Sequence, residues 1–159
     1  MSRTLVILLF TLLSCANFRT LKYKDSPNQI IASKEKATVC ILRPPNQIGG
    51  NYIIHDQEEK IGVLSGSSYF VIQLAPGKHV FSYSDAWKKS KDKFEINLEK
   101  EKTYYIALNQ VKVGSYASPQ MVDSPVYAGK FLLVKEEAVK HFFSEMNEVD
   151  LEASKSIYQ

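Results

Sequence analysis

Short runs rich in apolar, β-branched and aromatic residues, separated by turn-forming residues, occupy most of residues 37–134. Strand-like runs at a spacing of about 8–12 residues are typical of antiparallel sandwiches and barrels. The chain has 159 residues, which is enough for one domain with a sizeable core. We therefore predict a mainly β fold, an antiparallel β-sandwich or open barrel of about seven to eight strands with one C-terminal amphipathic helix.

The first predicted strands are set by apolar patterning and by turns. Ala37–Arg43 is apolar on both faces, which predicts a central strand, and Pro44 and Pro45 end it. The apolar runs 52–55 and 60–64 flank a polar turn, and this arrangement predicts a β-hairpin.

The later strands are predicted with less regular spacing. Apolar and polar residues alternate over 93–98, which predicts a half-buried strand, and 103–113 and 126–134 predict two longer strands. Residues 114–125 are rich in Ser, Pro and Gly and predict an irregular loop.

Residues 135–149 carry the pattern of an amphipathic helix. An apolar stripe at i, i+3, i+4 and i+7 would face the sheets. We expect this helix to pack against one edge or opening of the sandwich. The stripe consists of Val139, Phe142, Phe143 and Met146.

The N-terminus has the layout of a secretory signal peptide. Arg3 precedes the stretch 5–13, in which Thr11 is the single polar residue. This stretch is too short to span a bilayer, which takes about 20 residues. We therefore expect the segment to be removed rather than to remain as a membrane helix.

The end of that segment, Leu12-Leu13-Ser14-Cys15, resembles the bacterial lipobox. The resemblance implies transfer of diacylglycerol to the Cys15 sulfur, cleavage between Ser14 and Cys15, and acylation of the new amine. It implies a protein held in the cell envelope by membrane lipid. Ala16, in place of the Asp that favours retention at the inner membrane, favours the outer membrane.

These patterns divide the chain into four parts. We predict a signal peptide at 1–14, a lipidated N-terminus and tether at 15–36, the β-sandwich at 37–149 and a flexible tail at 150–159. A polar, flexible chain of the tether's length would reach roughly 25 Å, enough to hold the domain clear of lipid head groups.

Five short motifs follow one another in the predicted domain. They are A-T-V-C-I-L-R (37–43), I-G-V-L (61–64), G-S-S-Y-F (66–70), P-G-K-H (76–79) and K-T-Y-Y (102–105). In this order behind a lipobox they resemble a domain of unknown function found in bacterial lipoproteins. The resemblance implies a compact β-sandwich on a membrane anchor and brings no catalytic residue or cofactor with it.

Candidate catalytic and metal-binding residues do not form a recognisable set. Cys40 lies in an apolar strand and is expected to be a buried, inert thiol. His79 follows a Pro-Gly turn, where its ring is expected to bond a turn carbonyl. The run 55–59, His-Asp-Gln-Glu-Glu, reads as a solvated polar turn, with a weak cation site as the alternative. We predict no metal, no cofactor and no enzymatic activity.

One basic and aromatic cluster is a candidate contact surface. Its functional interpretation is binding of an anionic polymer or of lipid head groups, and its alternative is a soluble loop anchored by its tryptophan. The formal net charge of +3 is too small for a dedicated nucleic-acid binder. The cluster consists of Trp87, Lys88, Lys89 and Lys91.

Three functions remain open at this point. The first is a non-enzymatic envelope lipoprotein, a binding or assembly module for an envelope protein or a cell-wall partner. The second is a hydrolase acting on envelope polymers, with an unrecognised site that includes Asp85 or Asp123. The third is a carrier or binding protein for a small ligand, with the helix as a lid over a cavity beneath Phe142 and Phe143.

Overall fold

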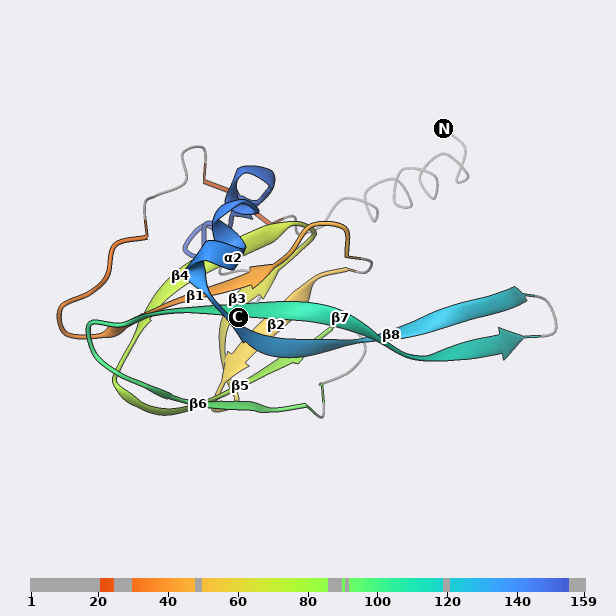
Figure 1. The fold of residues 1–159 in the computed structure, drawn as a ribbon, viewed down its shortest axis with the longest axis horizontal. Coiled ribbons are helices and arrows are strands. Elements are labelled where there is room, and N and C mark those ends of the chain that lie inside the picture. Colours follow the sequence, from red (N-terminus) through yellow and green to blue (C-terminus); the bar gives the residue numbers. More distant parts are fainter. Residues whose placement is uncertain are drawn as a thin grey trace, which may run out of the picture.

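Two β-sheets packed face to face form the body of the molecule (Figure 1). The computed structural model describes residues 21–24, 30–47, 50–85, 90, 92–118 and 121–154, with the backbone alone for 112–118 and 121–127. Within these residues the chain forms nine strands and one short C-terminal α-helix. The prediction of a mainly β sandwich or open barrel is confirmed, with nine strands rather than seven or eight.

The first sheet has five strands in the order β8-β7-β1-β4-β9. β1 lies at its centre, antiparallel to β4 and parallel to β7, and β9 runs parallel to β4. The strands are β1 (Ala37–Arg43), β4 (Ser68–Leu74), β7 (Thr103–Ser118), β8 (Met121–Val134) and β9 (Asn147–Glu148).

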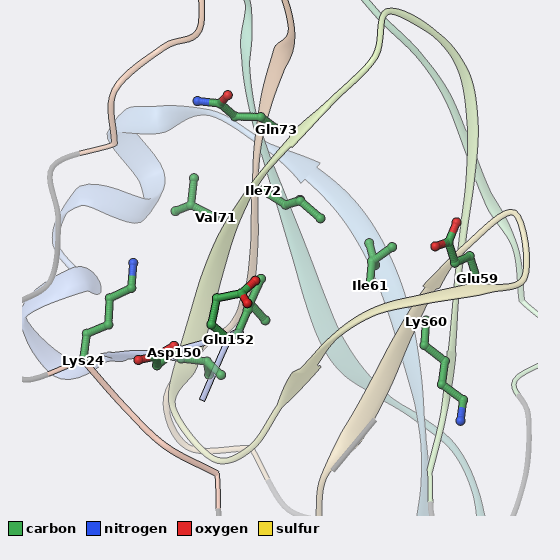
Figure 2. A pocket seen from close by; sticks show the side chains of 11 residues that line it. Lys24, Glu59, Lys60, Ile61, Val71, Ile72, Gln73, Asp150 and Glu152 are labelled. Carbon is green, nitrogen blue, oxygen red and sulfur yellow. The ribbon is translucent and has the colours of Figure 1, made fainter. Parts of the chain in front are cut away.

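The second sheet has four antiparallel strands in the order β3-β2-β5-β6. They are β2 (Tyr52–Asp56), β3 (Glu59–Leu64), β5 (Gly77–Ser84) and β6 (Phe94–Leu98), and the predicted hairpin is β2 and β3. β3 forms one edge of this sheet and lies beside β4 of the other sheet (Figure 2).

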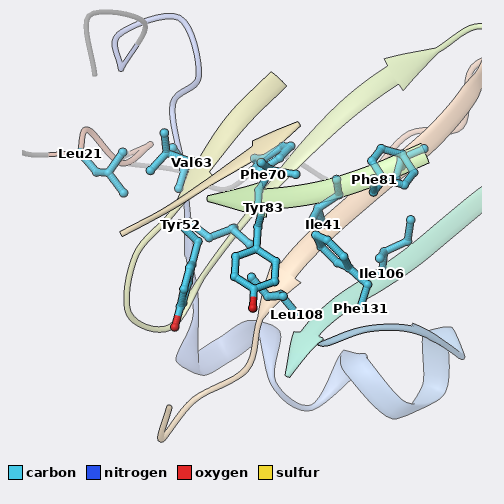
Figure 3. Packing of buried hydrophobic residues seen from close by; sticks show 14 of the residues in the cluster. Leu21, Ile41, Tyr52, Val63, Phe70, Phe81, Tyr83, Ile106, Leu108 and Phe131 are labelled. Carbon is cyan, nitrogen blue, oxygen red and sulfur yellow. The ribbon is translucent and has the colours of Figure 1, made fainter. Parts of the chain in front are cut away.

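The main core fills the space between the two sheets (Figure 3). Inward-facing side chains of both sheets are fully buried there, and Tyr52 and Tyr83 meet edge to face with ring centroids 5.3 Å apart. The largest fully buried residues of this core are Ile41, Phe70, Ile106 and Leu108 from the first sheet and Ile54, Phe81, Leu64 and Leu98 from the second.

A second, smaller core lies on the outer face of the five-stranded sheet. Cys40 and Leu42 point away from the main core and are fully buried against Val139 and Met146 of the C-terminal segment. Every residue of β1 is therefore buried, which confirms the prediction of a central strand. The molecule has three layers here: sheet, sheet and C-terminal segment.

The C-terminal helix is shorter than predicted. α2 spans Glu136–Lys140, a 3₁₀ turn spans Phe143–Glu145, and the chain then enters β9. The backbone N–H groups of Asn147 and Val149 donate to the carbonyls of Ser67 and Tyr69, so the helix does not continue to Val149. The predicted apolar stripe still packs, but against the face of the sheet rather than against an edge or opening.

The prediction of an irregular loop at 114–125 is wrong for residues 114–118 and 121–125, whose backbone forms strands. β7 and β8 continue as a paired hairpin that projects beyond the sandwich (Figure 1). Bulges after Lys112 and Tyr116 absorb unpaired residues and break the alternation that marks a strand in sequence. Pro125 is tolerated because β8 is an edge strand, where one side of the backbone needs no partner.

We expect Gly62→Ala to destabilise the fold by overpacking the main core. A Cβ atom at Gly62 would lie 2.6 Å from Cζ of the buried Phe70 ring, so the strand or the ring must shift. Such overpacking costs about 1–3 kcal/mol in the free energy of unfolding, measured by urea denaturation. Gly50→Ala is the control, because a Cβ at Gly50 meets no atom within 4 Å; equal stability of the two variants would contradict the packing described.

Candidate functional site

Two segments from opposite ends of the chain join at the edge of the five-stranded sheet. Residues 21–24 pair with residues 147–154, and we call this arrangement the terminal clasp. Tyr23 forms an antiparallel bridge with Val149, Lys24 N donates to the Glu148 carbonyl at 2.9 Å, and Asp150 N donates to the Lys22 carbonyl at 2.9 Å. The Leu21 side chain is part of the main core.

The terminal clasp differs from the predicted tether and tail. The sequence places residues 15–36 in a free tether and 150–159 in a flexible tail, whereas 21–24 and 150–154 are bound to the sandwich. Lys22 N also donates to Ser154 Oγ at 3.0 Å, and Ser154 is fully buried. The prediction was based on the polar composition of these two segments. Their backbone groups bond to partners about 130 residues away along the chain, and Lys22 and Ser154 are 132 residues apart.

A buried carboxylate lies at the centre of the clasp. Glu148 is 2% exposed, and its Oε1 lies 2.5 Å from Lys24 Nζ. Its Oε2 accepts a hydrogen bond of 3.4 Å from the Tyr69 hydroxyl. Burial, together with the Glu148 charge, raises the pKa of both the Tyr69 hydroxyl and the Cys40 thiol.

The clasp forms one wall of a groove of about 510 Å³, which we call the edge groove (Figure 2). The opposite wall is the free edge of β3, and the floor is the second half of β4. Its volume falls within the range of ligand clefts, about 300–1,000 Å³. The lining residues are Lys24, Glu59, Lys60, Ile61, Val71, Ile72, Gln73, Val149, Asp150, Leu151 and Glu152.

The edge groove combines an apolar lining with an acidic rim. Five of its eleven lining residues are aliphatic. The lining contains three carboxylates and two lysines, Lys24 and Lys60, and Lys24 is paired with Glu148. The groove therefore carries negative charge on a chain whose net charge is +3.

A smaller hollow of about 250 Å³ lies at the opposite side of the sandwich. It is formed between the edge strands β6 and β8, and its lining is more basic than that of the edge groove. The lining residues are Asp92, Lys93, Phe94, Lys130 and Phe131. The sandwich is thus open along both sides, with hollows of different size and charge.

The predicted polar turn at 55–59 is wrong for its first two residues. His55 and Asp56 are buried, and Asp56 Oδ2 lies 2.6 Å from His79 Nδ1. The other ring nitrogen of His79 lies 2.9 Å from the Ala75 carbonyl, which confirms the predicted bond to a turn carbonyl. This carboxylate and imidazole join the β2–β3 and β4–β5 turns.

A serine–histidine pair lies on the second sheet. His55 Nε2 lies 2.9 Å from Ser84 Oγ, and Nδ1 lies 3.4 Å from the Glu58 carbonyl. Such a pair can deprotonate a hydroxyl, but nucleophilic catalysis also needs a pocket that brings substrate to the oxygen. Neither the edge groove nor the smaller hollow is lined by His55 or Ser84.

Arg43, the last residue of the first motif, has a structural role. It is fully buried, and burial lowers the pKa of its guanidinium. Nη1 donates to the Gly50 carbonyl at 2.6 Å, and the guanidinium lies 4.8 Å from the centre of the Tyr52 ring. These contacts hold the connection between β1 and β2 against the sandwich.

Several predicted site residues lie outside the described residues. These are Ser14, Cys15, Trp87, Lys88, Lys89 and Lys91, and of Asp123 only the backbone is described. Asp85 is exposed and lines neither hollow. Within the described part of the chain, no cluster of histidine, cysteine and acidic residues could hold a metal, and no helix has the length and hydropathy to cross a membrane.

At the positions proposed for a lid, the aromatic side chains of the C-terminal segment pack on the second core. The Phe143 ring packs on Tyr69 and Tyr105, with ring centroids 5.0 Å and 6.3 Å apart. Phe142 is partly buried against the same core. The edge groove was not predicted, because its walls meet only in the folded chain; the one local hint was the acidic pair Asp150 and Glu152 after a buried valine.

Comparison with known proteins gives no relative for this chain. No protein-family model, curated protein or solved structure matches it.

We expect the Cys40 thiol to be unreactive in the folded protein. The thiolate is the reactive form, and burial raises the pKa of this thiol, so it stays protonated at pH 8. In a Cys15→Ala chain, iodoacetamide should label Cys40 in concentrated guanidinium chloride but not in native buffer, as measured by mass spectrometry. Equal labelling rates in both solutions would show that the second core is open.

We expect Lys24→Met to destabilise the fold, because the buried Glu148 carboxylate loses its ammonium partner. Breaking one side of a buried pair costs about 3 kcal/mol in the free energy of unfolding. Adding Glu148→Leu should recover most of that loss, since apolar residues can replace a buried pair. Lys22→Met is the control, because Lys22 is exposed and only its backbone bonds in the clasp; a loss as large as that of Lys24→Met would count against the buried pair.

Proposed function

We propose that this chain is a lipid-anchored protein of the bacterial cell envelope that acts by binding, as a binding or assembly module without enzymatic activity. The lipid anchor is assigned to Cys15 on its resemblance to the lipobox, and Ala16 favours the outer membrane. The observation that carries the binding role is the edge groove, a concave surface with an aliphatic lining and an acidic rim.

The terminal clasp supports a short distance between membrane and sandwich. Leu21 enters the main core six residues after Cys15. Six residues span at most about 20 Å when fully extended, so an acylated Cys15 would hold this edge of the sandwich near the bilayer surface. The edge groove, which includes Lys24 of the clasp, would then face partners that are themselves held at the membrane.

The lining of the edge groove supports binding over catalysis. Its carboxylates lie at an open rim, and its remaining lining consists of aliphatic side chains, two lysines and one glutamine. Neither a serine, a cysteine nor a histidine lines it. Such a surface offers shape, apolar contact and charge to a partner but no hydroxyl, thiol or imidazole nucleophile.

We expect wild-type cells to incorporate labelled palmitate into this protein and Cys15→Ala cells to lose the label. Loss of the acyl chains should also release the protein from membranes, because the sandwich retains no other lipid anchor in this proposal. Cys40→Ala is the matched control, since it removes the other cysteine of the chain and should keep the label.

The lipid anchor also has an outcome that would contradict it. A native protein that still begins with its initiator methionine and partitions into the aqueous phase of a Triton X-114 extraction would overturn the lipid anchor.

Photocrosslinking from Gln73 in intact cells tests the binding role separately, because this residue is exposed in the edge groove. Failure to crosslink any envelope protein would overturn that role.

A further inference from the structure

We propose that the edge groove binds an extended peptide segment of alternating basic and apolar residues from another envelope protein, and that this segment adds to β4 as a new strand beyond Tyr69. The inference rests on the proposed binding role of the sandwich and is independent of lipid at Cys15. It names the class of partner and the way in which it binds.

The outer edge of β4 is only partly covered. β1 pairs with β4 along its whole length, from Ser68 to Leu74. On the other side, β9 pairs with Ser68 and Tyr69 alone. From Phe70 onwards, the described residues include no strand on that side of β4.

The backbone of this uncovered edge is oriented for strand addition. The carbonyls of Ser67 and Tyr69 accept hydrogen bonds from the C-terminal segment, at 3.0 Å and 2.8 Å. Because strand backbone alternates in direction, Val71 and Gln73 direct their own N–H and C=O groups to the same side. A peptide entering the edge groove would continue the ladder that β9 begins.

The charge of the groove selects a basic strand. The carboxylates of Glu59, Asp150 and Glu152 line it on both walls, with Lys60 as the cation that is not held by the clasp. A basic peptide would be attracted to this rim and an acidic one repelled.

The aliphatic lining of the groove explains why the proposed peptide alternates apolar with basic residues. Val71 and Ile72 point to opposite sides of β4, and Ile61 lies on the facing wall (Figure 2). Every second side chain of an added strand would extend the Ile72 face and pack towards Ile61. The intervening side chains would be the basic ones and would meet the acidic rim.

Binding of a capped synthetic peptide of alternating lysine and valine, about eight residues long, tests the inference. Fluorescence anisotropy of the labelled peptide is measured with the detergent-purified full chain and with its Cys15→Ala form, and both should bind. A glutamate–valine peptide should not bind, nor should a lysine–valine peptide with N-methylated backbone, which cannot form the ladder.

Two variants separate the charge from the backbone contribution. Glu59→Lys with Glu152→Lys should weaken binding about tenfold or more, which corresponds to about 1.4 kcal/mol. Glu35→Lys with Glu137→Lys is the matched control, because it changes the net charge equally at exposed positions outside the groove. Gln73→Pro removes an edge N–H that β1 does not use, so it should interrupt the ladder and weaken binding while the thermal unfolding midpoint changes by only a few degrees.

Four results would overturn the inference. The first is no binding of the lysine–valine peptide to either form of the chain. The second is equal binding by the groove and control charge variants, and the third is unchanged binding by a folded Gln73→Pro variant. A sedimentation experiment showing a dimer that the peptide dissociates would assign the edge to a second copy instead and would also overturn it. Loss of palmitate labelling would leave the result untouched, since lipid attachment and peptide binding are measured separately.

Discussion

Burial of β1 on both of its faces is the constraint on which the rest of the structure depends. All seven residues of this strand are buried, and neighbouring side chains point into different layers. The four-stranded sheet covers one face. The other face presents Cys40 and Leu42, and leaving them in water would cost roughly 25 cal/mol for each Å² of apolar surface. The chain meets this requirement with the segment from Val139 to Met146, so the first strand determines where that segment must lie.

That requirement explains why residues 21–24 and 147–154 meet. To cover the outer face, the segment after α2 returns along the edge of β4, and Glu148 becomes buried there. A buried carboxylate is costly without a cation, and Lys24 supplies one from the N-terminal segment. We expect the pair to add specificity more than stability, because it joins Lys24 to the strand β9. Residues 21–24 therefore belong to the domain, although their composition resembles that of a linker.

Elements with a local signal were predictable and elements formed at long range were not. The central strand, the β2–β3 hairpin and the alternation in β6 follow from period-two patterns, and burial of Cys40 and the turn bond of His79 follow from their positions in them. β9 and the clasp have no such pattern, since they are short and their partners lie more than 70 residues away. The C-terminal helix was predicted too long because its apolar stripe is equally satisfied by one helical turn followed by a 3₁₀ turn. The edge groove depends on which strands end up at sheet edges, and this is decided by topology.

The acidic residues of the groove also protect an exposed sheet edge, a feature that every open sandwich has. A sheet edge with bare backbone groups invites pairing with another copy of the same chain, and charged residues are the usual protection. β3 carries Glu59 and Lys60 and β6 carries Glu95, but β4 has no charged residue of its own. Its protection comes from β9 over the first two residues and from Asp150 and Glu152 beside the rest. Two copies meeting at this edge would bring like charges together, whereas a basic strand would not. The same carboxylates can therefore disfavour self-association and favour a basic partner. The selectivity of the edge is the difference between the free energy of binding that partner and the free energy of binding a second copy.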